Sequence, residues 1–106
     1  MKPYAVGFAP EADDQLEALF LHVAGRSSVA TAARYLSAVV QTCERLSMFP
    51  HRGVLRDDIR PGLRVTHHKG RTIVAYAVAD ELRRVTILGV FHGGQDYAAR
   101  LSPDVD

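Results

Sequence analysis

The spacing of apolar residues changes once along this chain, and that change limits the folds it can adopt. Between residues 10 and 49, apolar side chains recur at every third or fourth position, the period of an amphipathic helix. Between residues 63 and 91 they alternate with a period of two, which is typical of strands. The sequence therefore predicts helices packed against a sheet, because neither part can bury its apolar side alone.

Local signals divide the helical part into two helices. Pro10 suits a first helical turn, and Gly25 marks the end of the first helix. Ser27 or Ser28 caps the second helix, which we expect to run up to Pro50. So short a link forces the two helices into an antiparallel hairpin.

The remaining elements complete an α+β order. Strands are predicted at residues 4–8, 63–67, 72–79 and 83–91, a loop at 50–62, and a short final helix at 95–101. The order β-α-α-β-β-β predicts an antiparallel sheet packed against the N-terminal helical hairpin. Residues 1–106 are expected to form a single domain whose tail, from about residue 102, is frayed.

Composition excludes several classes of protein. Charged residues make up 24% and hydrophobic residues 47% of the chain, which is ordinary for a globular domain. The single cysteine, Cys43, excludes an internal disulfide, and its place on an apolar helix face predicts a buried, inert thiol. No stretch has the pattern of a signal peptide or a membrane span. We therefore expect a cytoplasmic protein that needs no membrane, metal or cofactor.

Positive charge is concentrated in the second half of the chain. Residues 51–100 hold nine Lys or Arg against five Asp or Glu, although the net charge of the whole chain is only +1. Arg64, Arg71, Arg83 and Arg84 lie at or near the starts of predicted strands. Guanidinium groups bind carboxylate and phosphate in a bidentate fork. The bias suits an acidic partner or a phosphate backbone, and equally an ordinary mixed-charge surface.

His92 is the histidine that is best placed for a role in catalysis or binding. It stands where the last predicted strand meets Gly93 and Gly94. A histidine there could act as a general acid or base near neutral pH, or its ring could hold the loop in place. His67 and His68 are neighbours on a strand and point to opposite faces, which argues against a shared metal site.

Several short motifs occur along the chain in a defined order. They are residues 8–12 (FAPEA), 46–53 (LSMFPHRG), 60–64 (RPGLR), 73–78 (IVAYAV) and 87–93 (ILGVFHG), followed by Gln95 and Asp96. On these motifs, residues 4–97 resemble the RelE/ParE superfamily of bacterial toxin–antitoxin toxins, and the ParE branch best.

The resemblance implies a growth-inhibiting toxin of a type II toxin–antitoxin system. ParE-like members poison DNA gyrase and block replication without an enzymatic step, and this is the implied function. RelE-like members cut mRNA on the ribosome without a metal ion, so a ribosome-dependent endoribonuclease is the alternative. A non-toxic relative that retains antitoxin binding is a third possibility.

The resemblance also implies roles for individual residues. If the target is gyrase, no residue is catalytic and the docking residues are Arg64, Arg71, Arg83 and Arg84. If the protein is a nuclease, the active residues are His92, Arg64, Arg71 and Tyr97. The expected partner is a cognate antitoxin, ribbon-helix-helix and ParD-like, in a hetero-oligomer. Its expected contacts on the helical hairpin are Leu16, Leu19, Phe20, Leu36 and Val40.

Overall fold

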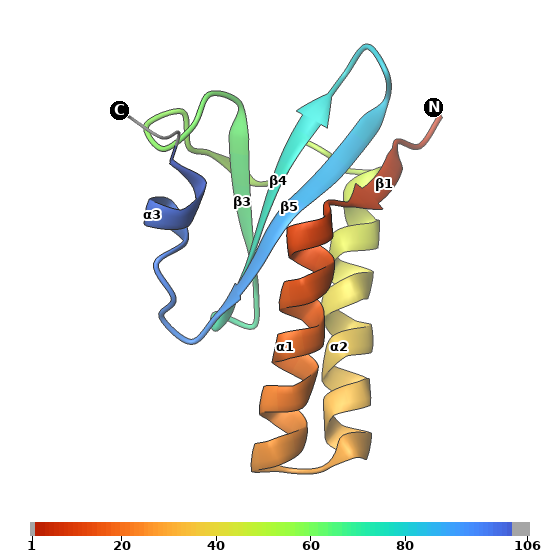
Figure 1. The fold of residues 1–106 in the computed structure, drawn as a ribbon. Helices are drawn as coiled ribbons and strands as arrows, with labels where there is room; N and C mark the ends of the chain where they lie inside the picture. The colour runs from red at the N-terminus through yellow and green to blue at the C-terminus, as the bar shows by residue number, and fades with distance from the viewer. Residues whose placement is uncertain (1, 103–106) are drawn as a thin grey trace.

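The computed structural model describes residues 2–102, so the frayed tail expected beyond Ser102 lies outside the described residues. The helices are α1 (Pro10–Arg26), α2 (Val29–Glu44), the 3₁₀ turn η1 (Arg45–Ser47) and α3 (Tyr97–Leu101), and the strands are β1 (Ala5–Phe8), β2 (Val54–Leu55), β3 (Leu63–His68), β4 (Thr72–Ala79) and β5 (Arg84–His92). The α1–α2 hairpin packs beside a twisted sheet and extends well beyond it (Figure 1). None of the described helices is long and apolar enough to cross a membrane.

Signals at the helix ends account for the hairpin. Glu11 and Asp13 lie in the first turn of α1, where carboxylates stabilise the helix dipole. Ser28 caps α2, because its side-chain oxygen accepts a hydrogen bond of 3.0 Å from the Thr31 N–H. Only Ser27 and Ser28 separate the two helices, which pack antiparallel as the sequence predicts.

The second helix is shorter than expected. The α-helical part ends at Glu44, and η1 follows instead of the final α-helical turn before Pro50. The N–H groups of Met48 and Phe49 both donate to the Arg45 carbonyl, at 3.2 Å each, a shared acceptor that is common where a helix ends. These two apolar residues match the helical spacing, yet they are 57% and 64% exposed.

The five strands form one mixed sheet in the order β1-β5-β4-β3-β2. The β3–β4 and β4–β5 pairs are antiparallel as expected, and β2 pairs antiparallel with β3. β1, however, runs parallel to β5, with Ala5 opposite Arg84 and Phe8 opposite Ile87. The expectation of a wholly antiparallel sheet is therefore wrong at this edge. A parallel pair needs a long crossover connection, and here the helical hairpin and three strands supply it.

One strand lies within the segment that was expected to be a loop. β2 pairs with β3, so that Val54 faces Val65 and Leu55 faces Arg64. Two residues are too few for a period of two to be visible in the sequence. The rest of the segment forms a loop that is closed by a 2.7 Å hydrogen bond from the Arg56 N–H to the carbonyl of the residue that begins β3.

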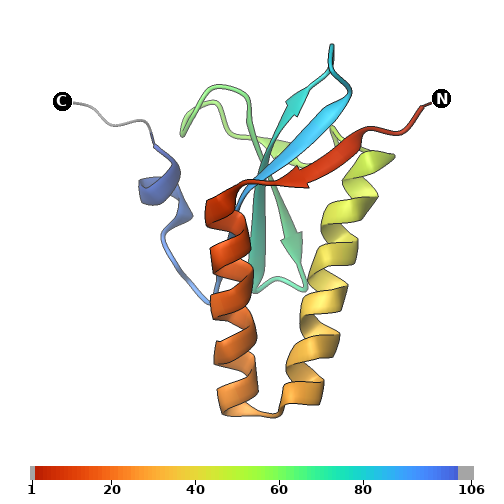
Figure 2. The ribbon, with the colours of Figure 1, turned by 45° about the vertical axis from the view of Figure 1, so that its right-hand side comes forward.

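Each face of the sheet carries its own apolar core. Against the hairpin and η1 pack Leu19, Val39, Cys43, Leu46, Val74, Tyr76, Val85, Ile87 and Val90. On the other face α3 and the loop before β3 contribute to a second core of Ile59, Leu63, Val65, Ala75, Phe91 and Leu101. Figure 1 shows α3 and the hairpin on opposite sides of the strands, and Figure 2 shows the two helices of the hairpin with their link at the end away from the sheet. Both faces of the central strands are thus buried, as their continuous apolar runs predict.

A β-bulge interrupts the pairing of the two longest strands. Ala75 pairs with Gly89, but the next residue of β4, Tyr76, pairs with Ile87. Leu88 therefore has no partner opposite it on β4. Such an extra residue shifts every following side chain of the bulged strand to the other face.

The effect of the bulge is visible at the end of β5. Val90 lies three positions after Ile87, yet both pack in the hairpin-side core, and Phe91 packs in the opposite core. The Val90 N–H donates a hydrogen bond of 2.7 Å to Gln15 Oε1, which joins α1 to the strand just past the bulge. His92 consequently ends the strand on the hairpin side.

The substitution Gly89→Ala is expected to destabilise the protein by about 1–3 kcal/mol, the usual cost of an extra methyl group in a packed site. A Cβ at this position would lie 2.6 Å from the Phe91 ring and 3.2 Å from Gln15 Oε1. Urea unfolding measures the loss. Gly7→Ala in β1 is the matched control, because no atom lies within 4 Å of a Cβ there. Equal stability of the Gly89→Ala variant and the wild type would contradict this account of the bulge.

Candidate functional site: a groove beside the end of β5

A groove of about 910 Å³ lies between α1 and the end of β5. Its charged and protonatable lining consists of Asp14, His22, Arg26, Arg71, His92 and Arg100, together with Tyr35 of α2. The apolar part of its wall includes Ala18, Val23 and Val90. The groove therefore combines an apolar wall with a largely cationic rim, contributed by elements that are far apart in the sequence.

A chain of hydrogen bonds forms one end of this groove. The Tyr35 hydroxyl lies 2.5 Å from Thr72 Oγ1, and Thr72 Oγ1 lies 3.1 Å from Nδ1 of His92. Thr72 is completely buried and stands opposite His92 in the β4–β5 ladder. This network links α2, β4 and β5, and it holds one nitrogen of the His92 ring inside the protein.

His92 is in a setting that disfavours its charged form. Its pKa is lowered first by burial and then by the nearby positive groups of His22 and Arg71. The rings of His22 and His92 are 5.5 Å apart, centroid to centroid, and inclined by 60°. The imidazole of His92 is therefore mostly neutral at pH 7 and does not carry a permanent positive charge.

The adjacent pair His67 and His68 behaves as the strand geometry predicts. His67 is exposed and His68 is buried, so the two rings face opposite sides of β3. His68 Nδ1 lies 2.8 Å from Thr42 Oγ1, whereas its Nε2 is buried and has no hydrogen-bond partner among the described residues. Burial, with smaller contributions from Lys69 and Arg45, lowers the pKa of His68.

The one cysteine has no reactive surroundings. Cys43 is fully buried in the hairpin-side core, and burial raises the pKa of its thiol to about 12. The thiol is therefore inert at neutral pH, as the sequence predicts. Within residues 2–102, no three histidine, cysteine or carboxylate side chains are grouped as they would be in a metal site.

The four arginines expected to dock a target lie in three different places. Arg64 donates hydrogen bonds from one guanidinium nitrogen to the carbonyls of His51 and Gly53, at 3.1 and 2.8 Å, so it supports a loop. Arg71 lines the groove. Arg83 and Arg84 are exposed at the β4–β5 turn, at the opposite end of β4 from Arg71. The eight residues of β4 separate these two ends, and their seven steps span about 23 Å.

The four residues of the alternative nuclease site are also not gathered together. His92 and Arg71 share the groove, but Arg64 lies in the middle of the sheet opposite Tyr76. Tyr97 packs in the core on the far face of the sheet.

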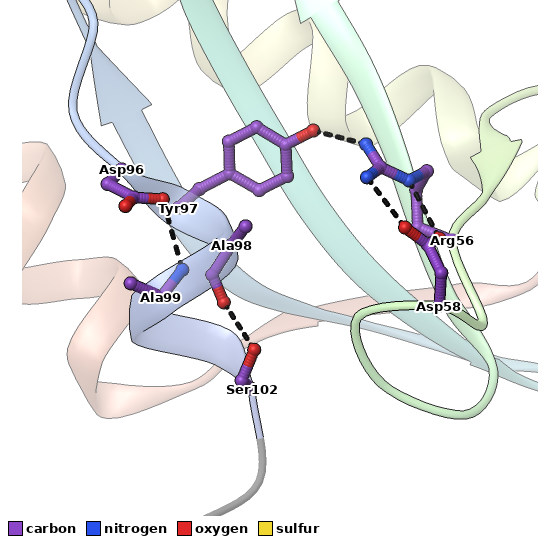
Figure 3. Close-up of polar contacts among 7 residues, drawn as sticks. All are labelled: Arg56, Asp58, Asp96, Tyr97, Ala98, Ala99 and Ser102. Carbon is purple, nitrogen blue, oxygen red and sulfur yellow. Dashed lines mark hydrogen bonds and ion pairs between the residues drawn. The ribbon is translucent and has the colours of Figure 1, made fainter.

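Tyr97 belongs to a separate polar cluster on that far face. Its hydroxyl accepts a 2.7 Å hydrogen bond from Arg56, whose guanidinium also binds both oxygens of Asp58 at 2.9 Å (Figure 3). The Arg56 hydrogen bonds lower the pKa of Asp58 below its ordinary value. Asp96 caps the short helix α3, because its carboxylate accepts a hydrogen bond from the Ala99 N–H. The cluster fixes α3 to the loop that precedes β3.

The apolar residues expected to contact an antitoxin divide into two groups. Leu19 is only 5% exposed, and Leu16 and Leu36 pack against the hairpin-side core. Phe20 and Val40 are half-buried and belong to neither core cluster. The second pair is thus the part of the set that lies outside both cores.

Sequence reasoning missed Tyr35 and Thr72, which hold His92, and it did not anticipate the exposed apolar side chains beside η1 and on β2. Tyr35 occupies a position on the apolar stripe of α2, so a hydroxyl on that stripe was a signal that a polar group lay opposite. The register that brings Thr72 to His92 depends on the bulge in β5, for which we find no local signal beyond Gly89.

Acidification is expected to lower the free energy of unfolding as the pH falls below about 6.5, the ordinary pKa of histidine. His68 and His92 have lowered pKa values in the fold, so the unfolded chain takes up protons at a pH where the folded chain does not. Stability is complete above that pH and falls until the folded histidines are protonated. Asp58 and Asp80 titrate below the ordinary aspartate pKa and do not contribute in this range.

Urea unfolding at about pH 7.5 and about pH 5.5 measures this loss. The variant His68→Leu should show a smaller loss, because it removes a buried ring that must be protonated. His67→Gln, at the exposed neighbour, is the control and should behave as the wild type does. Identical stability of the wild type at the two pH values would show that burial of these rings has no energetic consequence.

Comparison with known proteins finds one family and several solved structures that resemble this chain. The family described as "ParE toxin of type II toxin-antitoxin system, parDE" matches residues 6–97. The chain is similar to a chromosomal ParDE system from P. aeruginosa, with a TM-score of 0.72 and 18% identity over 85% of this chain and 96% of that one. A search of curated proteins gives no match.

Two further structures share the fold. The RelBE2 toxin–antitoxin complex from Mycobacterium tuberculosis has a TM-score of 0.65 and 29% identity over 87% of this chain and 93% of that one. A mutant of the E. coli toxin RelE in the free state has a TM-score of 0.66 and 14% identity over 94% of each chain. Since the family match spans most of the chain and the fold agrees with it, this protein belongs to the ParE toxin family of type II toxin–antitoxin systems.

Proposed function

We propose that this toxin inhibits DNA gyrase by binding, in the cytoplasm, and that it does so without catalysing a reaction. The match to the ParE family favours gyrase as the target. The observation that carries the proposal is the dispersal of the acid–base, phosphate-binding and stacking groups that a nuclease needs. Those groups must converge within hydrogen-bonding reach of one scissile phosphate.

Two of the four candidate nuclease groups are engaged elsewhere in the fold. The Arg64 guanidinium donates to two backbone carbonyls, and the Tyr97 hydroxyl accepts from Arg56 on the far face of the sheet. His92 has Arg71 beside it in the groove, but one of its ring nitrogens lies against Thr72. This distribution supports a binding protein over an endoribonuclease.

The β4–β5 turn is the surface that we propose for docking on the target. Leu82 is 69% exposed at this turn, and Arg83 and Arg84 beside it are exposed as well. Figure 1 shows the turn projecting from the body of the sheet. Arginine is one of the residue types most enriched in binding hot spots.

The proposed docking turn is anchored to the rest of the fold. Asp80 accepts a hydrogen bond of 2.7 Å from the Tyr4 hydroxyl and pairs with His51 Nε2 at 2.8 Å. These contacts, the Tyr4 hydrogen bond first, lower the pKa of Asp80, so its carboxylate stays ionised. A turn held in this way loses less conformational entropy when it binds.

The partner class of this family is an antitoxin, and we propose that it covers the exposed side of the hairpin. The related RelBE2 structure is a toxin–antitoxin complex. Phe20 and Val40 are half-buried on the hairpin, and Leu21 and Val29 are exposed on it. An amphipathic helix from a ribbon-helix-helix antitoxin would bury such side chains in a hetero-oligomer.

Purified toxin is expected to inhibit supercoiling of relaxed plasmid DNA by gyrase and to leave mRNA intact in growing cells. Supercoiling is followed on agarose gels, and transcripts are examined for cleavage after toxin induction. Heat-unfolded toxin serves as the control for both measurements. Rapid cleavage of ribosome-bound transcripts, with supercoiling unaffected, would overturn the proposal in favour of the nuclease.

The variant Arg84→Glu is expected to raise the toxin concentration needed for half-inhibition of gyrase by about tenfold or more, because charge reversal in a docking surface costs over 1 kcal/mol. Arg34→Glu is the matched control, since Arg34 is equally exposed but lies on α2, far from the turn. Equal inhibition by the two variants would place the docking surface elsewhere on the toxin.

A further inference from the structure

The end of the groove beside β5 brings three positive or protonatable side chains together. His22 comes from α1, His92 from the end of β5, and Arg71 from the turn between β3 and β4. The two histidine rings are 5.5 Å apart. All three side chains line the same groove.

These side chains have no counter-charge beside them in the described part of the chain. Asp14 is the one carboxylate among the described residues that line the groove, and it precedes His22 by eight residues of α1. Eight residues of helix span about 12 Å. The ion pairs of residues 2–102 are His51 with Asp80 and Arg56 with Asp58, and neither involves a residue of the groove.

We infer that the His22–His92 end of the groove is a carboxylate-binding subsite for an acidic segment of the antitoxin, and that protonation of these histidines strengthens its binding. The inference rests on the proposed antitoxin partner. It does not depend on the identity of the toxin's target.

The lining of the groove favours a peptide over a nucleic acid. Ala18, Val23 and Val90 present apolar surface along the wall, which suits the apolar side chains of an amphipathic peptide. Arg26 and Arg100 extend the positive charge along the rim. With a net charge of only +1, the chain lacks the excess of positive charge that dominates binding to a phosphate backbone.

The coupling to pH follows from the electrostatics of the groove. Burial, His22 and Arg71 each oppose a proton on His92. A bound carboxylate would replace that repulsion with attraction and so raise the pKa of His92, and by linkage a proton on His92 must then tighten binding. A rise of one pKa unit corresponds to about tenfold tighter binding in acid.

Other groups around the two histidines modify this coupling. They are Asp14 and Arg26 on α1, Tyr35 on α2, His68 on β3, Arg71 in the β3–β4 turn and Arg100 on α3. Only Asp14 is negative at neutral pH, so the surroundings as a whole favour an incoming anion.

Histidine titration by NMR tests the subsite directly, with glutarate as the carboxylate probe and chloride at equal ionic strength as the reference. The titration midpoint of His92 should rise in glutarate for the wild type and for Arg84→Gln, and it should rise much less for Arg71→Gln. The resonances of His51 and His67 are internal controls, because neither ring lines the groove. An unchanged midpoint of His92 in glutarate would overturn the inference.

A single-stranded DNA oligonucleotide serves as a second probe in the same titration. If it raises the midpoint of His92 and glutarate does not, the groove takes phosphate and the peptide inference is wrong. The expected result is the reverse.

Binding to the cognate antitoxin tests the coupling. The wild type should bind several-fold to about tenfold more tightly at about pH 6 than at about pH 7.5. His22→Gln, a change at an exposed position on α1, should reduce that ratio, and Arg84→Gln should keep it. Equal affinity of the wild type at both pH values would overturn the inference. Gyrase inhibition is measured without antitoxin. Its outcome therefore does not depend on the outcome of this binding measurement.

Discussion

The hydrogen bond between Gln15 and the Val90 N–H connects the two halves of this protein at the point where the longest strand changes its register. Without the bulge that precedes Val90, the strict alternation of β5 would place His92 on the far face and Phe91 under the hairpin. With the bulge, the His92 ring enters the groove and the Phe91 ring enters the opposite core. The position of the candidate site therefore depends on one unpaired residue, Leu88, and on the glycine that follows it.

The far face of the sheet depends on a different kind of stabilisation. α3 has five residues, which is too short for a helix to be stable by itself in water. It is held by Leu101 in the core beneath it and by the contact of Tyr97 with Arg56. Arg100 stands between these two anchored residues in the sequence and lines the groove beside β5. The polar cluster in Figure 3 thus also positions part of the cationic rim.

Much of the fold could be predicted from the sequence, because its longest elements have strong local signals. The helical period and the caps placed both helices, and the apolar runs identified β4 and β5 as central strands. The parallel pairing of β1 could not be predicted, since it joins residues about 80 positions apart and leaves no local pattern. The two residues of β2 were too few to show a period.

The site was less predictable than the fold for a related reason. His92 was recognised from its place beside two glycines, but its partners Tyr35 and Thr72 become neighbours only through strand register and helix packing. Arg64 illustrates the same limit, because its role is set by the carbonyls of a loop that has no sequence signature. Residue type indicated which side chains could bind anions, and tertiary structure decided which of them are free to do so.

The position of β5 between β1 and β4 has a consequence for synthesis of the toxin. The first strand of the chain has its only partner among the described strands in the last one, so the sheet cannot be completed until β5 has left the ribosome. Until then, Val74 and Tyr76 of β4 lack the neighbour that buries them. Long-range pairing of this kind slows folding and exposes apolar surface in the growing chain. The complete sheet therefore forms only after β5 has been synthesised.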